Sequence, residues 1–348
     1  MPAPPAVGYT PAMDPVTHIV SGALAGRLAR DGMGTRAAYG LCVLAAWLPD
    51  IDNFVGLGPE AYLRHHRGIT HSLLGIVVQA VLLAAAFRLF GRAFTPLKTF
   101  ALALALLAGH LWLDVITSFG TQLLAPFSDA RLAWGGVFII DPVMTLGALA
   151  LLVLSLRRSA RGAAGRRLAA AGLALLVAYP LACHGVRAVV TAATARALAP
   201  HGWDRSFDIS PDALSPFFWK LTVRDGERLL VGHVTALTAP GDPLELESHT
   251  AADPLLLERL GQRSSMFATW AWFARFPVVQ AQELPGAQDG RTRLRFLDAR
   301  FLPTSPVLRP LAGRRETPFA ITAVLAPDGA LERVLYAGHS HPLRPPGS

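Results

Sequence analysis

A cluster of ionisable and hydroxyl side chains stands immediately before a long apolar run. The stretch HHRGITHS, residues 65–72, contains three imidazoles and one guanidinium. Such side chains are costly at membrane depth, so their presence at the start of an apolar helix indicates ligation or catalysis. His66 and His71 are five positions apart and match one helical face poorly, so we expect His66 in the loop and His71 in the first helical turn.

A second group of ionisable residues has a spacing suited to a metal ion. His110 and Asp114 are four residues apart, which places both side chains on one helical face with Cβ atoms about 6 Å apart. They could hold one ion together, or the carboxylate could orient the imidazole; a plain buried hydrogen bond is the simpler alternative. Asp50 and Asp52 follow Pro49 and could bracket an ion from two sides, although aspartates in such turns often serve only as caps.

The elements that must position these residues are long and apolar. Hydrophobic residues make up 52% of the 348-residue chain and charged residues only 16%, with the apolar excess between residues 16 and 190. A helix of about 20 apolar residues crosses a bilayer core, and four runs have that length: 72–90, 99–118, 137–156 and 168–190. The shorter runs 16–29 and 37–48 are short spans, a re-entrant pair or buried helices. We expect an α-helical membrane domain of about four to six membrane helices.

The loops between the apolar runs carry a regular charge bias. Every second loop is basic, and short loops rich in Lys and Arg stay on the cytoplasmic side. The basic residues are Arg27, Arg30, Arg36, Arg88, Arg92, Lys98, Arg157, Arg158, Arg161, Arg166 and Arg167. Six alternating crossings with both termini outside the cytoplasm fit this bias. On that topology the ionisable residues of the apolar part all lie near the extracytoplasmic face: His18, Asp50, Asp52, His65, His66, His71, His110, Asp114 and Asp141.

The pattern of apolar and polar residues changes beyond the last apolar run. Segments 219–234, 292–302 and 319–338 alternate apolar and polar residues in part, and two of them contain Asp-Gly pairs typical of hairpin turns. We therefore predict a smaller β-rich (α+β) extracytoplasmic domain. The expected division of the chain is an integral membrane domain over residues 1–194 and a soluble β-rich domain over residues 195–348.

Composition excludes some other classes of protein. The formal net charge is +8, but nucleic-acid-binding proteins gather basic residues with aromatics on one folded face. Here many arginines lie in loops between apolar runs, so no nucleic-acid partner is expected. The two cysteines, Cys42 and Cys183, lie in apolar segments and imply no disulfide framework. The Pro- and Ala-rich first fifteen residues lack the basic start of a signal peptide, so no cleaved leader is expected.

Four motifs occur along the chain in the order DPVTHIVSG, LPDID, HHRGITHS and GHLWLDVITSFGT. Through them, residues 14–145 resemble the YdjM-like family of bacterial inner-membrane proteins, which are described as membrane-bound metal-dependent hydrolases. The resemblance implies an integral inner-membrane hydrolase with a divalent metal at the matching positions, which are His18, Asp50, Asp52, His66, Arg67, His71, His110 and Asp114. Asp141 matches less closely, His65 is extra to the motif, and residues 195–348 lie beyond the shared region.

The predicted reaction is attack by metal-activated water on an ester or phosphoester, with a membrane lipid favoured because the site opens at the bilayer surface. Imidazole and carboxylate ligands suit zinc, with manganese, iron or magnesium as alternatives. We expect the ligands, for one ion or two, to be His18, Asp50, His71, His110 and Asp114. Asp52 or His66 would serve as general base, and Arg67 would hold an anionic group.

Two other functions are open at this level. Intramembrane His and Asp residues also form proton or metal-ion relays in transporters. The residues of such a relay are distributed through the bilayer, whereas the residues here gather near one face of the membrane. The metal could instead pin together the helices of a non-enzymatic scaffold. Structural zinc sites are closed by four protein ligands and are often rich in cysteine, which this cluster lacks. The oligomeric state, the substrate and the role of residues 195–348 stay open.

Overall fold

The structure is a computed structural model that describes residues 14–33, 35–55, 58–90, 95–158, 162–203, 205–238, 244–283, 290–306, 309 and 317–344. The prediction about a leader concerns mainly residues 1–13, which lie outside these ranges. Arg92 and Arg161 of the loop-charge argument lie outside them as well.

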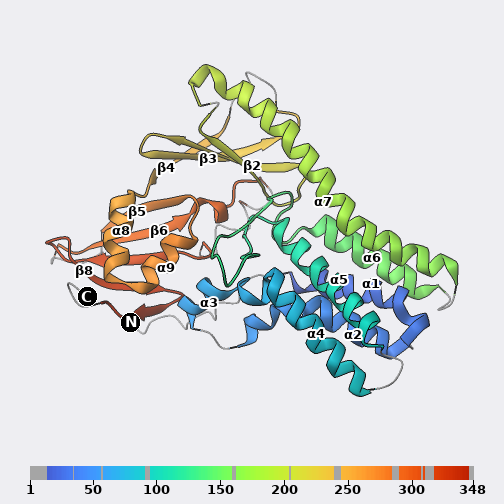
Figure 1. The fold of residues 1–348 in the computed structure, drawn as a ribbon. Helices are drawn as coiled ribbons and strands as arrows, with labels where there is room; N and C mark the ends of the chain where they lie inside the picture. The colour runs from blue at the N-terminus through green and yellow to red at the C-terminus, as the bar shows by residue number, and fades with distance from the viewer. Residues whose placement is uncertain are drawn as a thin grey trace.

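A helical region and a sheet domain share the chain (Figure 1). The helices of the first are α1 (Pro15–Met33), α2 (Thr35–Trp47), α3 (Pro59–His65), α4 (Leu73–Phe90), α5 (Pro96–Val115), α6 (Pro142–Arg157) and α7 (Ala163–Leu198). Two 3₁₀ turns connect them, η1 (Leu48–Phe54) and η2 (Ile69–His71). Proline begins α1, α3, α5 and α6, at a position where the missing N–H would have no partner inside the helix.

Helices α1 and α2 pack at close range because glycines face the partner helix. A Cβ atom at Gly22 would lie 2.6 Å from the carbonyl oxygen of Cys42, and one at Gly26 would lie 3.0 Å from Tyr39. Glycine at both positions lets the two backbones approach. Gly22 faces Cys42 and Gly26 faces Tyr39, so the two helices are antiparallel. The start of α1, which carries His18, therefore lies beside the end of α2 and the η1 turn that follows it.

Two helices of the described residues, α5 and α7, are long and apolar enough to cross a membrane. The segment of α3 and η2 together with α4 is a third candidate if its bend of 63° belongs to one span. Helices α2 and α6 contain 13 and 16 residues. The helical membrane part is therefore confirmed in outline, with two to three span candidates, and the expected four to six crossings stay a prediction.

Helix α7 connects the helical region to the sheet domain. With 36 residues it is about 54 Å long, well beyond the roughly 30 Å of a bilayer core. Figure 1 shows α7 running from α6 past the loops of the helical region to the first strands. Near its far end Arg187 donates to the carbonyl oxygens of Ile209 and Trp134, both at 2.8 Å. The expected division after residue 194 falls inside this helix, which continues to Leu198.

Nine strands form one antiparallel sheet in which each strand pairs with the next along the chain. They are β1 (Phe207–Pro211), β2 (Phe218–Asp225), β3 (Arg228–Thr235), β4 (Leu246–Ala251), β5 (Pro277–Glu283), β6 (Thr292–Asp298), β7 (Ile321–Leu325), β8 (Leu331–Tyr336) and β9 (His339–His341). Gly226 and Gly329, with φ of 59° and 81°, form the tight turns of the β2–β3 and β7–β8 hairpins. The predicted hairpins and β-rich domain are confirmed.

Helices α8 (Pro254–Arg263) and α9 (Ser265–Phe273) follow β4 and precede β5 along the chain, and they pack on the sheet. Trp270 of α9 is fully buried, and its indole N–H donates to the carbonyl oxygen of Phe319 at 2.6 Å. On its other side α9 contacts α3, where the Ser265 hydroxyl donates to Glu60 Oε2 at 3.0 Å. The sheet domain is therefore attached to the helix that immediately precedes His66.

Candidate metal centre

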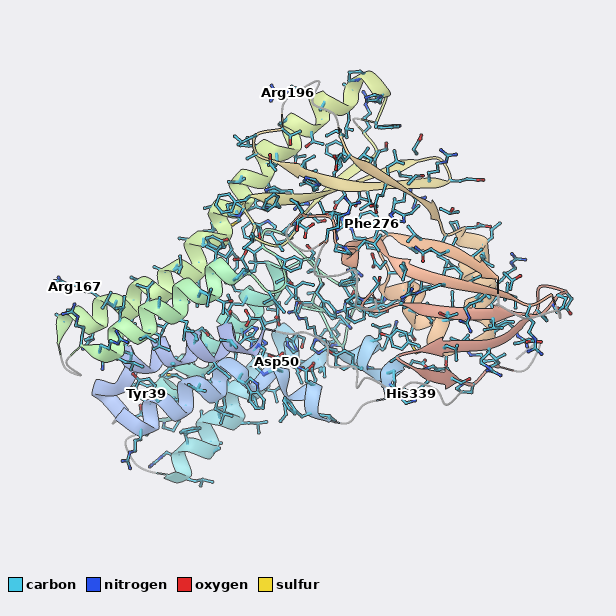
Figure 2. The ribbon with its side chains drawn as sticks, turned by 180° about the vertical axis from the view of Figure 1, so that it is seen from behind. Tyr39, Asp50, Arg167, Arg196, Phe276 and His339 are labelled. Carbon is cyan, nitrogen blue, oxygen red and sulfur yellow. The ribbon has the colours of Figure 1, made fainter. Side chains whose placement is uncertain are left out.

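Five buried side chains from four elements converge at the end of the helical region nearest the sheet domain. They are His18 of α1, Asp50 of η1, His71 of η2, and His110 and Asp114 of α5, none of them more than 5% exposed. Figure 2 shows Asp50 where the helices meet the sheet domain. The structure thus brings together all the residues that the sequence suggested as metal ligands.

The ligating atoms of these side chains lie within a few ångströms of one another. His71 Nε2 and His110 Nε2 are 3.1 Å apart, and each is 3.3 Å from Asp114 Oδ2. Asp50 Oδ1 is 3.5 Å from His71 Nε2 and 3.8 Å from His110 Nε2. His18 Nε2 lies 3.6 Å from Asp114 Oδ1 on the other side. Three imidazoles and two carboxylates therefore form one connected cluster.

Hydrogen bonds behind the rings assign the nitrogen that faces this point. His110 Nδ1 is 2.7 Å from the carbonyl oxygen of Ala46, which can only accept, so Nδ1 carries a proton and, in the neutral ring, Nε2 has the lone pair. The Thr70 hydroxyl donates to Asp52 Oδ2 and therefore accepts from His71 Nδ1 at 2.9 Å. The lone pair of His71 is then also on Nε2. When both rings are neutral, two lone pairs face each other across 3.1 Å, and a shared cation would remove their repulsion.

The spacing and chemistry of these atoms fit a divalent cation. Ligand atoms about 2.1 Å from a tetrahedral ion are roughly 3.4 Å from one another, close to the observed 3.1–3.8 Å. Asp50 Oδ1 and Asp114 Oδ2 are buried acceptors that receive no hydrogen bond from the described residues. Two overlapping triads could hold an ion: His18, His110 and Asp114, and Asp50, His71 and His110. Mixed imidazole and carboxylate ligands suit zinc, manganese or iron.

Asp52 lies behind the centre and organises a second set of contacts. Its Oδ1 is 3.1 Å from His66 Nδ1, and its Oδ2 accepts from the Arg67 backbone N–H at 3.1 Å and from the Thr70 hydroxyl at 3.3 Å. Burial raises the pKa of the Asp52 carboxyl, but the hydrogen bond and charge of His66 outweigh it and lower the pKa below its usual value. Asp52 is therefore ionised at neutral pH and oriented toward His66.

Arg67 brings a positive charge into the centre. Its Nη2 is 2.6 Å from Asp114 Oδ1, and its Nη1 donates to the backbone oxygen of Asp114 and to the Thr117 hydroxyl, both at 3.1 Å. The backbone of Arg67 has φ of 56°, a left-handed conformation that is uncommon outside glycine. Its N–H bond to Asp52 helps to hold that conformation. The guanidinium is thus committed mainly to one metal-ligand candidate, Asp114.

A glycine allows the His71 turn to lie against the start of α4. Ser72 Oγ accepts from the Gly75 N–H at 2.9 Å and donates to the carbonyl oxygen of Ile69 at 2.9 Å. A Cβ atom at Gly75 would lie only 1.9 Å from that same carbonyl oxygen. Only glycine permits this approach, which fixes where the His71 imidazole points.

Two ionisable residues singled out in the sequence lie apart from the centre. His65 is exposed at the end of α3. Asp141 caps α6, where it accepts from the Met144 N–H at 3.0 Å and from the Ser215 hydroxyl at 2.9 Å. Asp141 therefore joins α6 to the start of the sheet domain, because Ser215 precedes β2.

Sequence reasoning missed two contributors to the site. The Ala46 carbonyl oxygen sets the tautomer of His110 from 64 positions away, and a backbone atom leaves no trace in residue types. Arg131 lies beside His66, yet in the sequence it resembles any other loop arginine. Its position in a loop without excess basic charge was the one available signal.

Comparison with known proteins covers the helical region and also β1 and the start of β2, so the shared region extends past the expected limit at residue 194. The family described as YdjM inner membrane protein matches residues 13–221, a segment that contains all five ligand candidates. The uncharacterized protein YfhP of Bacillus subtilis (strain 168) is 31% identical over 150 residues, which are 41% of this chain and 46% of that protein. The chain thus matches about half the length of this curated relative. No solved structure is significantly similar to the chain.

Proposed function

Because the chain belongs to the YdjM inner membrane protein family, we propose that it is a membrane-bound metal-dependent hydrolase of phosphoesters or other esters. One observation carries this proposal: the Nε2 atoms of His71 and His110 and the Asp114 carboxylate converge within 3.3 Å, buried and with their lone pairs inward. Phospholipids contain such esters and surround a protein of the inner membrane, so they are the proposed substrate class.

The five ligand candidates would hold one divalent ion or two. When bound, the ion supplies Lewis-acid polarisation of the scissile bond and a lowered pKa for water. Five protein ligands exceed the three that are usual at a catalytic zinc. Zinc is nevertheless the proposed metal, since three of the five ligands are imidazoles, and manganese, iron and magnesium are the alternatives.

His66 and Asp52 form the proposed proton-transfer pair. The Asp52 carboxylate holds His66 Nδ1 at 3.1 Å, which fixes the ring orientation and leaves Nε2 as the nitrogen that exchanges a proton. The His66 ring also stacks on Tyr62 with centroids 4.7 Å apart. Asp52 itself accepts hydrogen bonds at both oxygens, so it acts by positioning His66 and not as a base.

Arg67 would balance the negative charge of the centre. It neutralises Asp114 through the 2.6 Å contact, and its charge lies next to the point where a substrate oxyanion would bind. Both Nη atoms already have partners, whereas Nε has no hydrogen-bond partner among the described residues.

The proposed site faces the extracytoplasmic side. Figure 2 shows Arg167 at the end of the helical region that is far from Asp50 and from the sheet domain. Short basic loops stay in the cytoplasm, so the opposite end, with the metal centre and the sheet domain, would lie outside it. This orientation places the centre near the outer headgroups of the inner membrane.

Elemental analysis of the purified full chain, followed by a hydrolysis screen of phospholipids and soluble phosphoesters, tests the proposal. The native protein should hold about one or two divalent ions per chain and hydrolyse at least one substrate. His71→Ala and His110→Ala should each lower metal content and turnover at least about tenfold, with circular dichroism unchanged. His65→Ala, exposed at the end of α3, is the matched control and should change neither.

The outcomes separate the possible functions. Normal metal content in both variants would remove these residues as ligands. Loss of metal without loss of turnover would show that the ion only holds the helices together. Metal or proton flux in liposomes that requires His71, without any hydrolysis, would identify a transporter instead.

A further inference from the structure

An arginine and aromatic cluster lies between the metal centre and the sheet domain. Its members are Arg67, Arg131, Arg300, Phe119, Trp272 and Phe273. Trp272 and Phe273 belong to α9 of the sheet domain, and Phe119 follows α5 of the helical region. The Phe119 ring lies 5.6 Å from the ring of His66. The cluster therefore adjoins the proposed proton-transfer pair.

Arg131 lies among three of these rings. Its guanidinium carbon is 4.9 Å from the centroid of Phe119, 5.3 Å from Phe273 and 5.5 Å from Trp272. A guanidinium stacks on aromatic rings through its flat face, which leaves the N–H groups at its edge to bind other partners. The antiparallel bridge between Thr121 and Leu132 holds the neighbouring backbone in place.

The hydrogen bonds of Arg131 leave part of its donor capacity unused. Nη2 donates to the carbonyl oxygen of Gly120 at 3.0 Å, and Nη1 and Nη2 reach the carbonyl oxygen of His66 only at 3.5 Å. Nε is buried and has no hydrogen-bond partner among the described residues. A guanidinium has five N–H donors, so donors remain for a ligand next to His66.

The charge of Arg131 has no carboxylate partner among the described residues. Arg67 is 2.6 Å from Asp114 and Arg300 is 2.7 Å from Asp298, but no described carboxylate lies within ion-pair distance of Arg131. Burial, with repulsion from Arg67 and Arg300, lowers the pKa of the Arg131 guanidinium to about 9, so it is still charged at neutral pH. A largely buried cation without a counter-charge is costly, and an oxyanion would relieve that cost.

We propose that Arg131 binds a phosphoryl oxyanion beside the metal centre, with α9 of the sheet domain forming the aromatic wall of that site. This inference rests on the proposed hydrolase function and names the substrate group. A phosphoryl group is favoured over a carboxylate because its additional oxygens and charge match the unpaired N–H groups of Arg131 and the nearby charge of Arg67. The sheet domain then takes part in substrate binding.

Phosphate binding to the metal-loaded full chain in detergent tests the inference. Isothermal titration with inorganic phosphate and with a short-chain phosphatidic acid should show binding to the native protein. Arg131→Gln should weaken the binding of at least one of the two at least about tenfold, because a charge-assisted hydrogen-bond pair is lost. Dependence on Arg131 for phosphatidic acid alone identifies a lipid headgroup as the source, and dependence for inorganic phosphate identifies a free anion.

Arg64→Gln is the matched control. Arg64 stacks on the same Trp272 at 4.4 Å but is paired with Asp129 at 2.9 Å, so its loss should change affinity less than about twofold. Arg131→Lys keeps the charge in case the glutamine variant does not fold, and it should bind severalfold more weakly because it lacks the planar fork. Unchanged affinity of a folded Arg131 variant for both ligands, or no binding of either ligand by the native protein, overturns the inference.

The inference and the proposed function can fail separately. Binding that depends on Arg131 in a protein without hydrolytic activity would retain the oxyanion site and remove the hydrolase. Hydrolysis of a phosphoester with the same KM in the native protein and in Arg131→Gln would retain the hydrolase and remove the role of Arg131.

Discussion

The substitution Asp52→Asn should uncouple proton transfer at His66 from metal binding. In the native protein Asp52 has three short contacts: His66 Nδ1 at 3.1 Å, the Arg67 N–H at 3.1 Å and the Thr70 hydroxyl at 3.3 Å. An asparagine keeps one acceptor oxygen and gains an NH₂ donor. The oxygen should stay toward Arg67 and Thr70, which supply two donors, so the NH₂ group faces His66 Nδ1.

The tautomer of His66 sets the size of the effect. Its Nδ1 must then accept a hydrogen bond, so the ring proton moves to Nε2, the nitrogen proposed to take a proton from water. General acid–base catalysis contributes about 10²–10⁴-fold, and hydrolysis at saturating metal should fall at least about 100-fold. Metal affinity should fall less, by about tenfold, because all five ligand candidates remain. Among them Asp52 supports only His71, whose Nδ1 lies 3.5 Å from Asp52 Oδ2.

Initial rates at saturating metal, with metal affinity measured by competition against a chelator, check both numbers. Asp129→Asn is the control, because this half-exposed carboxylate pairs with Arg64 at 2.9 Å and should have no effect on either quantity. A folded, metal-loaded Asp52→Asn protein with a rate within about threefold of the native rate would refute the His66–Asp52 pair.

Two further predictions concern the turn that carries His71 and a buried lysine of the sheet domain. Gly75→Ala should destabilise the protein by about 1–3 kcal/mol and weaken metal binding, because the new Cβ would lie 1.9 Å from the Ile69 carbonyl oxygen. Gly109→Ala, with no neighbour within 4 Å, should neither destabilise the protein nor weaken metal binding in the same thermal and metal titrations. Burial lowers the pKa of Lys220 from 10.5 to about 8. The native state therefore disfavours the charged amine, and stability should rise by roughly 3 kcal/mol from pH 8 to 10.5. Lys220→Met should lose this rise in fluorescence-detected unfolding, and parallel curves for the two proteins would contradict the assignment.

The predicted helices and hairpins followed from patterns that local sequence carries. Apolar runs predicted helices close to α4, α5, α6 and α7, because a continuous apolar surface needs lipid or other helices around it. Alternation with Asp-Gly pairs predicted the β2–β3 and β7–β8 hairpins, since Gly226 and Gly329 permit positive φ. The same patterns do not fix the number of membrane crossings, because short apolar helices also form in protein interiors.

The ligand candidates could be predicted because ionisable residues are rare in apolar helices and stand out by type. Loop charges predicted that His18, Asp50, His71 and His110 share one end of the helical region, and they do. The loop charges also placed Asp141 near that end, but they do not distinguish a residue that caps a helix from one that belongs to the metal centre. Its hydrogen bonds to Met144 and Ser215 depend on where α6 meets the sheet domain.

The sequence by itself determined which residues can ligate a metal and which segments can enter a membrane, because residue type and period are local properties. Only the tertiary structure decided how these residues act. The Ala46 carbonyl oxygen determines which nitrogen of His110 carries the proton, and Asp114 forms an ion pair with Arg67. Helix α9 places aromatic rings against Arg131. Each of these contacts joins atoms that are distant along the chain, and a hydrogen bond or ring contact forms only when packing brings its two groups within a few ångströms.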